Sequence, residues 1–177
     1  GLGPTDPSPA ASSDENHGTS VAGVAAASAN NLGGRGAAPA AKLVGYNRSA
    51  VDFMQSEHED TALSHNVEKA DISINSRQIV RTNNNGPQLT GIGFILPPLP
   101  GFNTGVEKGV KDGRRGKGTI YLFAAGNGGN PLPPLIFGSP LAPDDSNYNG
   151  VSNNRHVMAI CATDARGKKA TYSESGA

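Results

Sequence analysis

Small and apolar side chains recur with a helical period at three places along the chain. The first repeat predicts a helix over about residues 17–29, packed through its small side chains. The second repeat predicts a helix over about residues 60–70. For the third helix we expect Asn103 or Thr104 to cap the start, and Gly113 to lie near the end.

Four shorter apolar runs predict strands, at residues 42–46, 71–75, 119–124 and 156–162. The run 119–124 is apolar almost throughout, which is typical of a strand with both faces covered by helices. Because helices and strands alternate along the chain, the pattern predicts an α/β fold with a parallel sheet and right-handed crossovers. Ligands gather at the carboxyl ends of the strands in such sheets, which singles out residues 75–76 and 125–129.

Composition limits the size of the core. The chain has 36% hydrophobic residues, 24 glycines, 13 prolines and no tryptophan. A length of 177 residues suits one domain, here residues 1–177. We therefore expect either a small core joined by long loops, such as the Pro- and Gly-rich residues 83–103, or a core that residues outside this chain complete.

The charges and the cysteine exclude several classes of function. Fifteen basic and fifteen acidic residues cancel, which gives no reason to expect nucleic acid as a partner. The basic cluster at residues 114–117 is interpreted as a solvated loop. No apolar stretch is long enough for a membrane span, and the first residues lack the pattern of a signal peptide. Cys161 lies in an apolar run, which predicts a buried, unreactive thiol.

Two strings of residues carry candidate chemistry. The string 17–23, His-Gly-Thr-Ser-Val-Ala-Gly, places His17 at the start of a small-residue helix, which would fix an imidazole on a rigid element. Read alone, a histidine at this position could simply cap the helix. The string 124–129, Ala-Ala-Gly-Asn-Gly-Gly, follows the apolar run. There the amide of Asn127 could donate to a developing oxyanion, while glycines such as Gly126 expose backbone to a substrate; the simpler interpretation is a Gly-Asn turn.

Taken together, the two strings resemble the subtilisin-like serine proteases (peptidase S8), and the wider chain resembles their kexin or proprotein-convertase branch. Further stretches occur in the order of that family, at residues 14–17, 29–31, 113–120, 144–150 and 170–177. The resemblance implies a three-layer, parallel-sheet α/β subtilisin-like fold. It also implies that this chain is an internal part of the catalytic domain, incomplete at both ends.

The resemblance implies a Ser-His-Asp mechanism acting on a peptide or protein substrate, with His17 as the general base and Asn127 in the oxyanion hole. The catalytic aspartate and the serine are expected outside the chain. Asp14 lies too close to His17 to be that aspartate, and instead matches an acidic position that lines a substrate pocket. The parent protein is expected to be secreted or periplasmic, and its oligomeric state is left open.

The resemblance also implies bound calcium at two sites, since oxygen-rich irregular loops suit this ion. The first site would use the Asn31 side chain and the carbonyls of Ser28, Gly33 and Arg35. The second would use Asp144 and Glu174. For these two carboxylates, an ordinary solvated loop is the alternative interpretation.

Two departures from the family bear on specificity. Ser76-Arg77-Gln78 stands where the family has Ser-Trp-Gly, a wall of the primary substrate pocket. Asn149 replaces an aspartate that reads a basic residue in the convertases. Strict cleavage after Arg or Lys is therefore not expected, although Ser76 and Asn149 are both expected to contact substrate.

Three hypotheses follow from the sequence. The first is a part of a calcium-stabilised serine endopeptidase, for which the parent reading frame should supply the missing aspartate and serine. The second is a pseudoprotease or a calcium-binding structural module that kept the scaffold without catalysis. The third is a generic α/β ligand-binding domain, which the His17 string disfavours.

Overall fold

The computed structural model describes most of the chain in four stretches: residues 16–46, 56–77, 97–130 and 143–176. The chain divides into two compact units, residues 1–53 and residues 54–177. Within the described residues, no helix combines the length and the apolar character that crossing a membrane requires.

The first unit contains helix α1 (His17–Ala26). The helix ends three residues before the predicted position, because Ala27 leaves the helical region with φ −55° and ψ 133°. The chain then loops out and returns to the end of the helix. There the N–H groups of Gly36, Ala37 and Ala38 donate to carbonyl oxygens at the end of α1 and just beyond it, at 2.8–3.0 Å. The last carbonyls of α1 are thereby satisfied by the returning chain.

The predicted strand at residues 42–46 is wrong. These residues are described, and none of them belongs to a strand. Leu43 and Val44 are 56% and 68% exposed. A short apolar run becomes a strand only when another strand supplies its hydrogen-bond partners.

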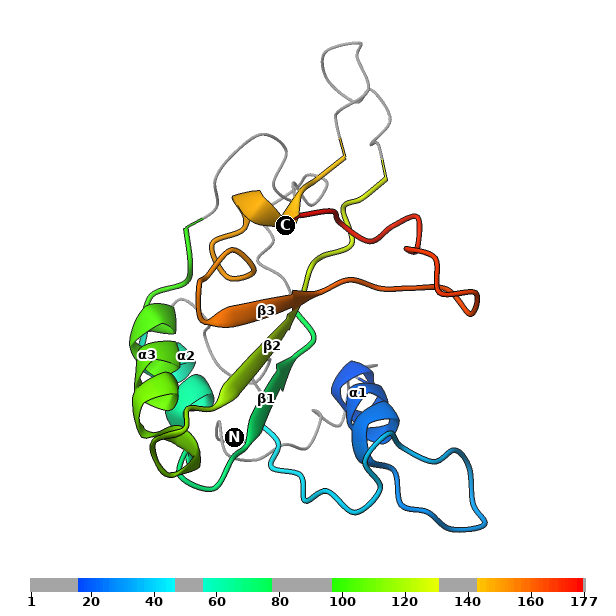
Figure 1. Cartoon of the computed structure of the whole chain (residues 1–177), viewed down its shortest axis with the longest axis horizontal. Coiled ribbons are helices and arrows are strands. Elements are labelled where there is room, and N and C mark those ends of the chain that lie inside the picture. The colour runs from blue at the N-terminus through cyan, green and yellow to red at the C-terminus, as the bar shows by residue number, and fades with distance from the viewer. Residues whose placement is uncertain (1–15, 47–55, 78–96, 131–142, 177) are drawn as a thin grey trace. The chain divides into compact units, whose positions relative to one another are not determined.

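The second unit is built around a sheet with two helices (Figure 1). Its elements follow the chain as α2 (Ser56–Ser64), β1 (Ile72–Asn75), α3 (Phe102–Asp112), the 3₁₀ turn η2 (Gly113–Gly116), β2 (Ile120–Ala124), the 3₁₀ turn η3 (Ser146–Tyr148) and β3 (Val157–Ile160). The three strands pair in parallel in the order β1-β2-β3. The predicted α/β fold with a parallel sheet is therefore confirmed.

The sheet register places the ends of the strands at one edge. Asn75 pairs with Phe123, and Ala124 pairs with Ile160. The segments that follow the three strands therefore leave the sheet from the same side (Figure 1). This carboxyl edge contains both segments that the sequence analysis singled out.

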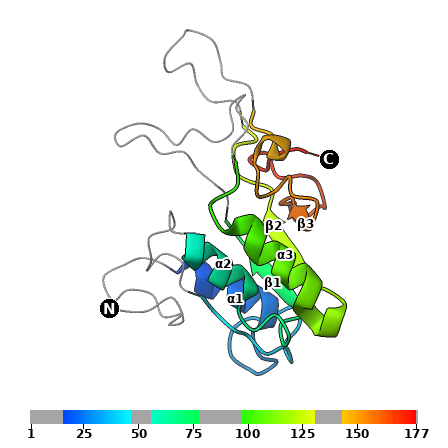
Figure 2. The same ribbon diagram turned by 90° about the vertical axis from the view of Figure 1, so that its left-hand side faces the viewer.

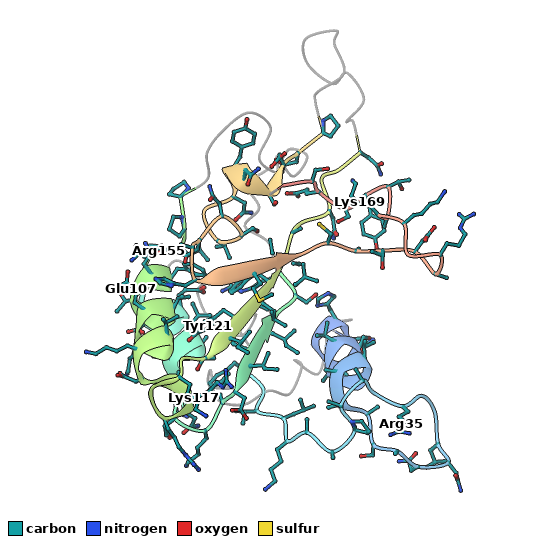
Figure 3. All side chains as sticks on the ribbon, in the orientation of Figure 1. Arg35, Glu107, Lys117, Tyr121, Arg155 and Lys169 are labelled. Carbon is teal, nitrogen blue, oxygen red and sulfur yellow. The ribbon has the colours of Figure 1, made fainter. Side chains whose placement is uncertain are left out.

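Helices α2 and α3 contact each other and lie on one face of the sheet (Figure 2). Aromatic side chains fill the space between the layers: the rings of Phe102 and Phe123 meet edge to face, with their centroids 5.5 Å apart. Tyr121 points from β2 toward the helices (Figure 3), and its hydroxyl donates to the carbonyl of Leu63 at 2.6 Å. Burial raises the pKa of Tyr121 to about 12. The Tyr121 hydroxyl is therefore a polar group within the core, and it has its hydrogen bond.

The opposite face of the sheet is covered by neither α2 nor α3. Side chains alternate along a strand, and those on this face are partly exposed: Ile72, Ile74, Met158 and Ile160 range from 48% to 57%. We expected helices on both faces of the sheet. The helices of this unit, α2 and α3, cover one face.

The bounds of α2 and α3 also differ from the prediction. Helix α2 begins four residues earlier and ends at Ser64, because Asn66 adopts a left-handed backbone with φ 52°. Val67 lies beyond the end of the helix and is nevertheless buried. Helix α3 begins after Gly101, which has φ 79°, and neither Asn103 nor Thr104 caps it.

Candidate active site

His17 is the first residue of α1, as the sequence predicted, and it is exposed. Asn16 occupies the N-cap position, and its carbonyl accepts from both the N–H and the hydroxyl of Ser20, at 2.9 and 3.0 Å. The imidazole is therefore presented from a helix start whose backbone is fixed locally. Asp14, the expected substrate-pocket residue, lies outside the described residues.

Asn127 follows β2 at the carboxyl edge, and it is also exposed. The residues around it are held by backbone hydrogen bonds from two directions. Ala125 donates to the carbonyl of Ile160 at 3.0 Å, and Gly129 donates to the carbonyl of Tyr172 at 2.9 Å. A rigid backbone of this kind is what an oxyanion donor requires, since its geometry must be set before the reaction.

The backbone and the surroundings of Gly126 both favour glycine at this position. Its φ of 125° is rarely adopted by other residues, and an added Cβ would lie 2.0 Å from a carboxylate oxygen of Glu174. The carbonyl of Gly126 accepts from the Glu174 N–H at 3.1 Å, and the Gly128 N–H donates to Glu174 Oε1 at 3.0 Å. Glu174 therefore supports the segment that carries Asn127.

Glu174 is almost fully buried, at 1% exposure. Burial is the main cause that raises the pKa of its carboxyl to about 7, and the charges of Asp144 and Asp145 raise it further, while the bond from Gly128 lowers it. Its Oε2 atom is buried and has no hydrogen-bond partner among the described residues. An orphaned carboxylate oxygen beside two other acids is an unfavourable arrangement that a cation would relieve.

The two expected ligands of the second calcium site are brought together by a parallel bridge between Asp145 and Ser175. Asp144 is buried at 6% exposure, and its Oδ1 accepts from the Asp145 N–H at 2.8 Å. The alternative of a solvated loop does not suit carboxylates this buried. Among the described residues, however, no group of three or more His, Cys, Asp or Glu side chains is arranged to hold a metal ion. Main-chain or amide oxygens would have to complete any such site.

The four expected ligands of the first calcium site share the loop that follows α1, where the hydrogen bond from Gly36 to Ala27 closes the turn at 3.0 Å. Ser28, Asn31, Gly33 and Arg35 are all exposed on it. Gly33 has a φ of 64°. The structure therefore places the four residues on one closed loop.

The remaining predicted site residues lie at the carboxyl edge or near it. Ser76 is exposed directly after β1. Asn149 is buried at 5% exposure, and its Oδ1 accepts from the Val151 N–H at 3.1 Å, so this side chain oxygen serves a local turn.

The predicted burial of Cys161 is wrong: the residue is exposed. It follows the last residue of β3, where the sheet no longer covers it, and its thiol lies 3.5 Å from the carbonyl of Glu174.

One feature of the carboxyl edge is not evident from the sequence. Arg77 forms an ion pair with Glu59 of α2, and its guanidinium lies 5.2 Å from the centre of the Phe123 ring. Glu59 and Arg77 are 18 residues apart, and no helical or strand period links them. Only the fold reveals the pair.

A family model and several known proteins are similar to this chain, and all of them belong to one family of proteases. The model of the subtilase family (peptidase S8) matches residues 2–177. Kexin of Saccharomyces cerevisiae is 32% identical over 163 residues, which is 92% of this chain and 17% of the relative. Endoprotease bli-4 of Caenorhabditis elegans is 38% identical over 127 residues, 71% of this chain and 12% of the relative. Proprotein convertase subtilisin/kexin type 4 of Mus musculus is 31% identical over 165 residues, 92% and 22% respectively. The chain therefore spans less than a quarter of the length of each of these relatives.

Proposed function

The chain belongs to the subtilase family, on its kexin branch, and we propose that it is the middle part of the catalytic domain of a serine endopeptidase. The exposed Asn127, held rigidly at the carboxyl edge of a parallel sheet, is the observation that supports this proposal most. The substrate would be a peptide or protein. The parent protein would supply the catalytic aspartate and the serine from outside these 177 residues.

In the proposed mechanism, His17 takes the proton of the serine hydroxyl as the oxygen attacks the scissile carbonyl carbon. The carbonyl oxygen gains negative charge, and the Asn127 amide donates a hydrogen bond to it. The protonated His17 then gives its proton to the leaving amine, and an acyl-enzyme remains. Water then attacks the acyl-enzyme in the same way, with His17 as the base, which releases the acid and restores the serine.

We further propose that calcium binds at the second site, where Asp144 and Glu174 would provide two of its ligands. The buried, unpartnered Oε2 of Glu174 supports this assignment, since a cation would satisfy it. The closed loop after α1 is the candidate for the first site, through Ser28, Asn31, Gly33 and Arg35. Bound calcium would neutralise the charges of Asp144 and Glu174, and would so stabilise the segment that carries Asn127.

We propose a secreted or periplasmic location for the parent protein. Calcium sites built from few carboxylates bind weakly, in the range typical of extracellular modules, and are filled where calcium is abundant.

Active-site labelling of the full-length parent tests the proposed activity. A fluorophosphonate probe should label the parent protein, and His17→Ala should abolish the labelling, because the serine then lacks its base. A folded parent protein that resists the probe would instead favour a pseudoprotease or a calcium-binding module on the same scaffold.

A further inference from the structure

Ser173 is a polar residue in the interior of the second unit, with 1% exposure. Its hydroxyl accepts a hydrogen bond from the N–H of Ala162 at 3.1 Å. Its backbone N–H donates to the carbonyl of Ala170 at 3.0 Å. Its carbonyl accepts from the Nζ of Lys169, which Figure 3 labels, at 2.7 Å. These bonds fix Ser173 in one position, because breaking any of them would leave a buried polar group without its partner.

The same bonds tie Ser173 to the end of β3. Ala162 comes two residues after Ile160, which is the last residue of that strand. While the N–H of Ala162 donates to Ser173, its carbonyl accepts from the Ala170 N–H at 2.9 Å. Both backbone groups of Ala162 are therefore bonded to residues 170–173. Ser173 is thus anchored to a strand of the sheet as well as to its own loop.

On its other side, Ser173 lies against the segment that follows β2. Its carbonyl fills the space in which a Cβ at Gly129 would lie, so the two backbones are in contact. The neighbours of Ser173 bond to the same segment. The Gly129 N–H donates to the Tyr172 carbonyl at 2.9 Å, and the Glu174 N–H donates to the Gly126 carbonyl at 3.1 Å. A shift of Ser173 would therefore move the backbone at both ends of residues 126–129.

An oxyanion donor is effective only if its position is set before the reaction. We propose that Ser173 is a positioning residue for Asn127, because its buried hydroxyl joins the segment after β2 to the end of β3. The inference rests on the proposed endopeptidase function and adds a residue to its machinery. Ser173 acts on the reaction through residues 126–129, which it and its neighbours contact.

The variant Ser173→Ala in the full-length parent protein tests the inference, with fluorescein-labelled casein as substrate. Loss of the hydroxyl leaves the Ala162 N–H without its partner, so the backbone around residue 173 should shift. Because a displacement of about 1 Å can cost about 100-fold in rate, kcat should fall at least about tenfold while KM changes little. Excess calcium fills the proposed site at Glu174 in both proteins, which removes weaker calcium binding as the cause.

A second background separates positioning from a general structural effect. In the Asn127→Leu protein, Ser173→Ala should change kcat by less than about twofold, because the donor that it positions is absent. The control Ser64→Ala removes another buried hydroxyl, which donates to Asp60 at 3.1 Å on α2, and should leave kcat unchanged. An unchanged kcat in Ser173→Ala, or the same fall in both backgrounds, would overturn the inference.

Hydrogen exchange measured by mass spectrometry tests the anchoring without catalysis. Ser173→Ala should speed the exchange of the amides of residues 126–129 about tenfold, and Ser64→Ala should not. If casein is not cleaved but this difference is found, the proposed function fails and the positioning of residues 126–129 by Ser173 stands. Exchange at the wild-type rate contradicts the inference, whatever the activity. If Ser173→Ala does not fold, Lys169→Met replaces it in both measurements, since it removes a bond to Ser173 from an exposed side chain.

Discussion

At the scale of single residues, Glu174 has two roles. It supports the segment that carries Asn127, and it is a proposed calcium ligand. Its carboxylate contacts Gly126 and Gly128 on either side of Asn127. It does so while almost fully buried and close to Asp144 and Asp145. The Glu174 carboxylate therefore destabilises the folded state when it is charged and has no cation beside it, and a bound cation would remove this cost.

This environment predicts a pH-dependent stability in the presence of a calcium chelator. The pKa of Glu174 rises from 4.5 to about 7 on folding. Between these values the folded state holds a proton that the unfolded state has released, so the free energy of unfolding falls as pH rises through this window. Urea unfolding of the parent protein at pH 5 and pH 8 should show a loss of roughly 1–3 kcal/mol that Glu174→Gln reduces.

Calcium should act in the opposite direction in the same experiment. At pH 8 it should stabilise the wild type through binding to the folded state, and Glu174→Gln should weaken that gain. Glu107→Gln, on the exposed surface of α3, is the matched control and should keep both responses. A free energy of unfolding at pH 8 that is the same with calcium and with chelator would contradict the second calcium site.

The functional residues differ in how far the sequence could predict them. His17 and Asn127 stand in short strings beside predicted elements, so their exposure on a helix start and after a strand could be anticipated. The ion pair of Arg77 with Glu59 could not, because it depends on how α2 packs against the end of β1. The exposure of Cys161 was missed because its run of apolar residues continues past the end of β3.

At the scale of elements, α3 packs closely on β2. Gly109 of α3 faces Tyr121 of β2, and a Cβ added at Gly109 would lie 1.7 Å from the tyrosine hydroxyl. The hydroxyl in turn bonds to Leu63 at the end of α2. One buried side chain therefore sets the spacing of both helices from the sheet.

Gly109→Ala should destabilise the protein, because the new methyl group forces Tyr121 away from its bond to Leu63. The expected loss in the free energy of unfolding is about 1–3 kcal/mol. Glu107→Ala, on the same helix but exposed, should change it by no more than about 0.5 kcal/mol. Denaturant unfolding that shows no difference between the two variants would contradict the described packing.

Strands were easier to predict than helix ends in this chain. β1, β2 and β3 all lie within predicted apolar runs, and Tyr121 and Phe123 of the central strand β2 enter the core. The run at residues 42–46 looked similar but forms no strand, since strand formation also depends on a partner distant in sequence. The ends of α2 and α3 depend on left-handed backbones at Asn66 and Gly101, which apolar periodicity does not reveal.

At the scale of the whole molecule, the proposed catalytic groups come from different compact units. His17 belongs to residues 1–53, and Asn127 belongs to residues 54–177. The family model matches both units, and the compared relatives are several times longer than this chain. Catalysis is therefore proposed for the longer parent protein.

We propose that Asn127 stabilises the transition state of peptide hydrolysis, and measuring the kcat of Asn127→Leu in the full-length parent protein checks this role. An oxyanion donor acts on the transition state more than on the bound substrate, so kcat should fall roughly 10²–10³-fold while KM changes little. A kcat equal to that of the wild type, in a variant that folds normally, would rule out this role of Asn127.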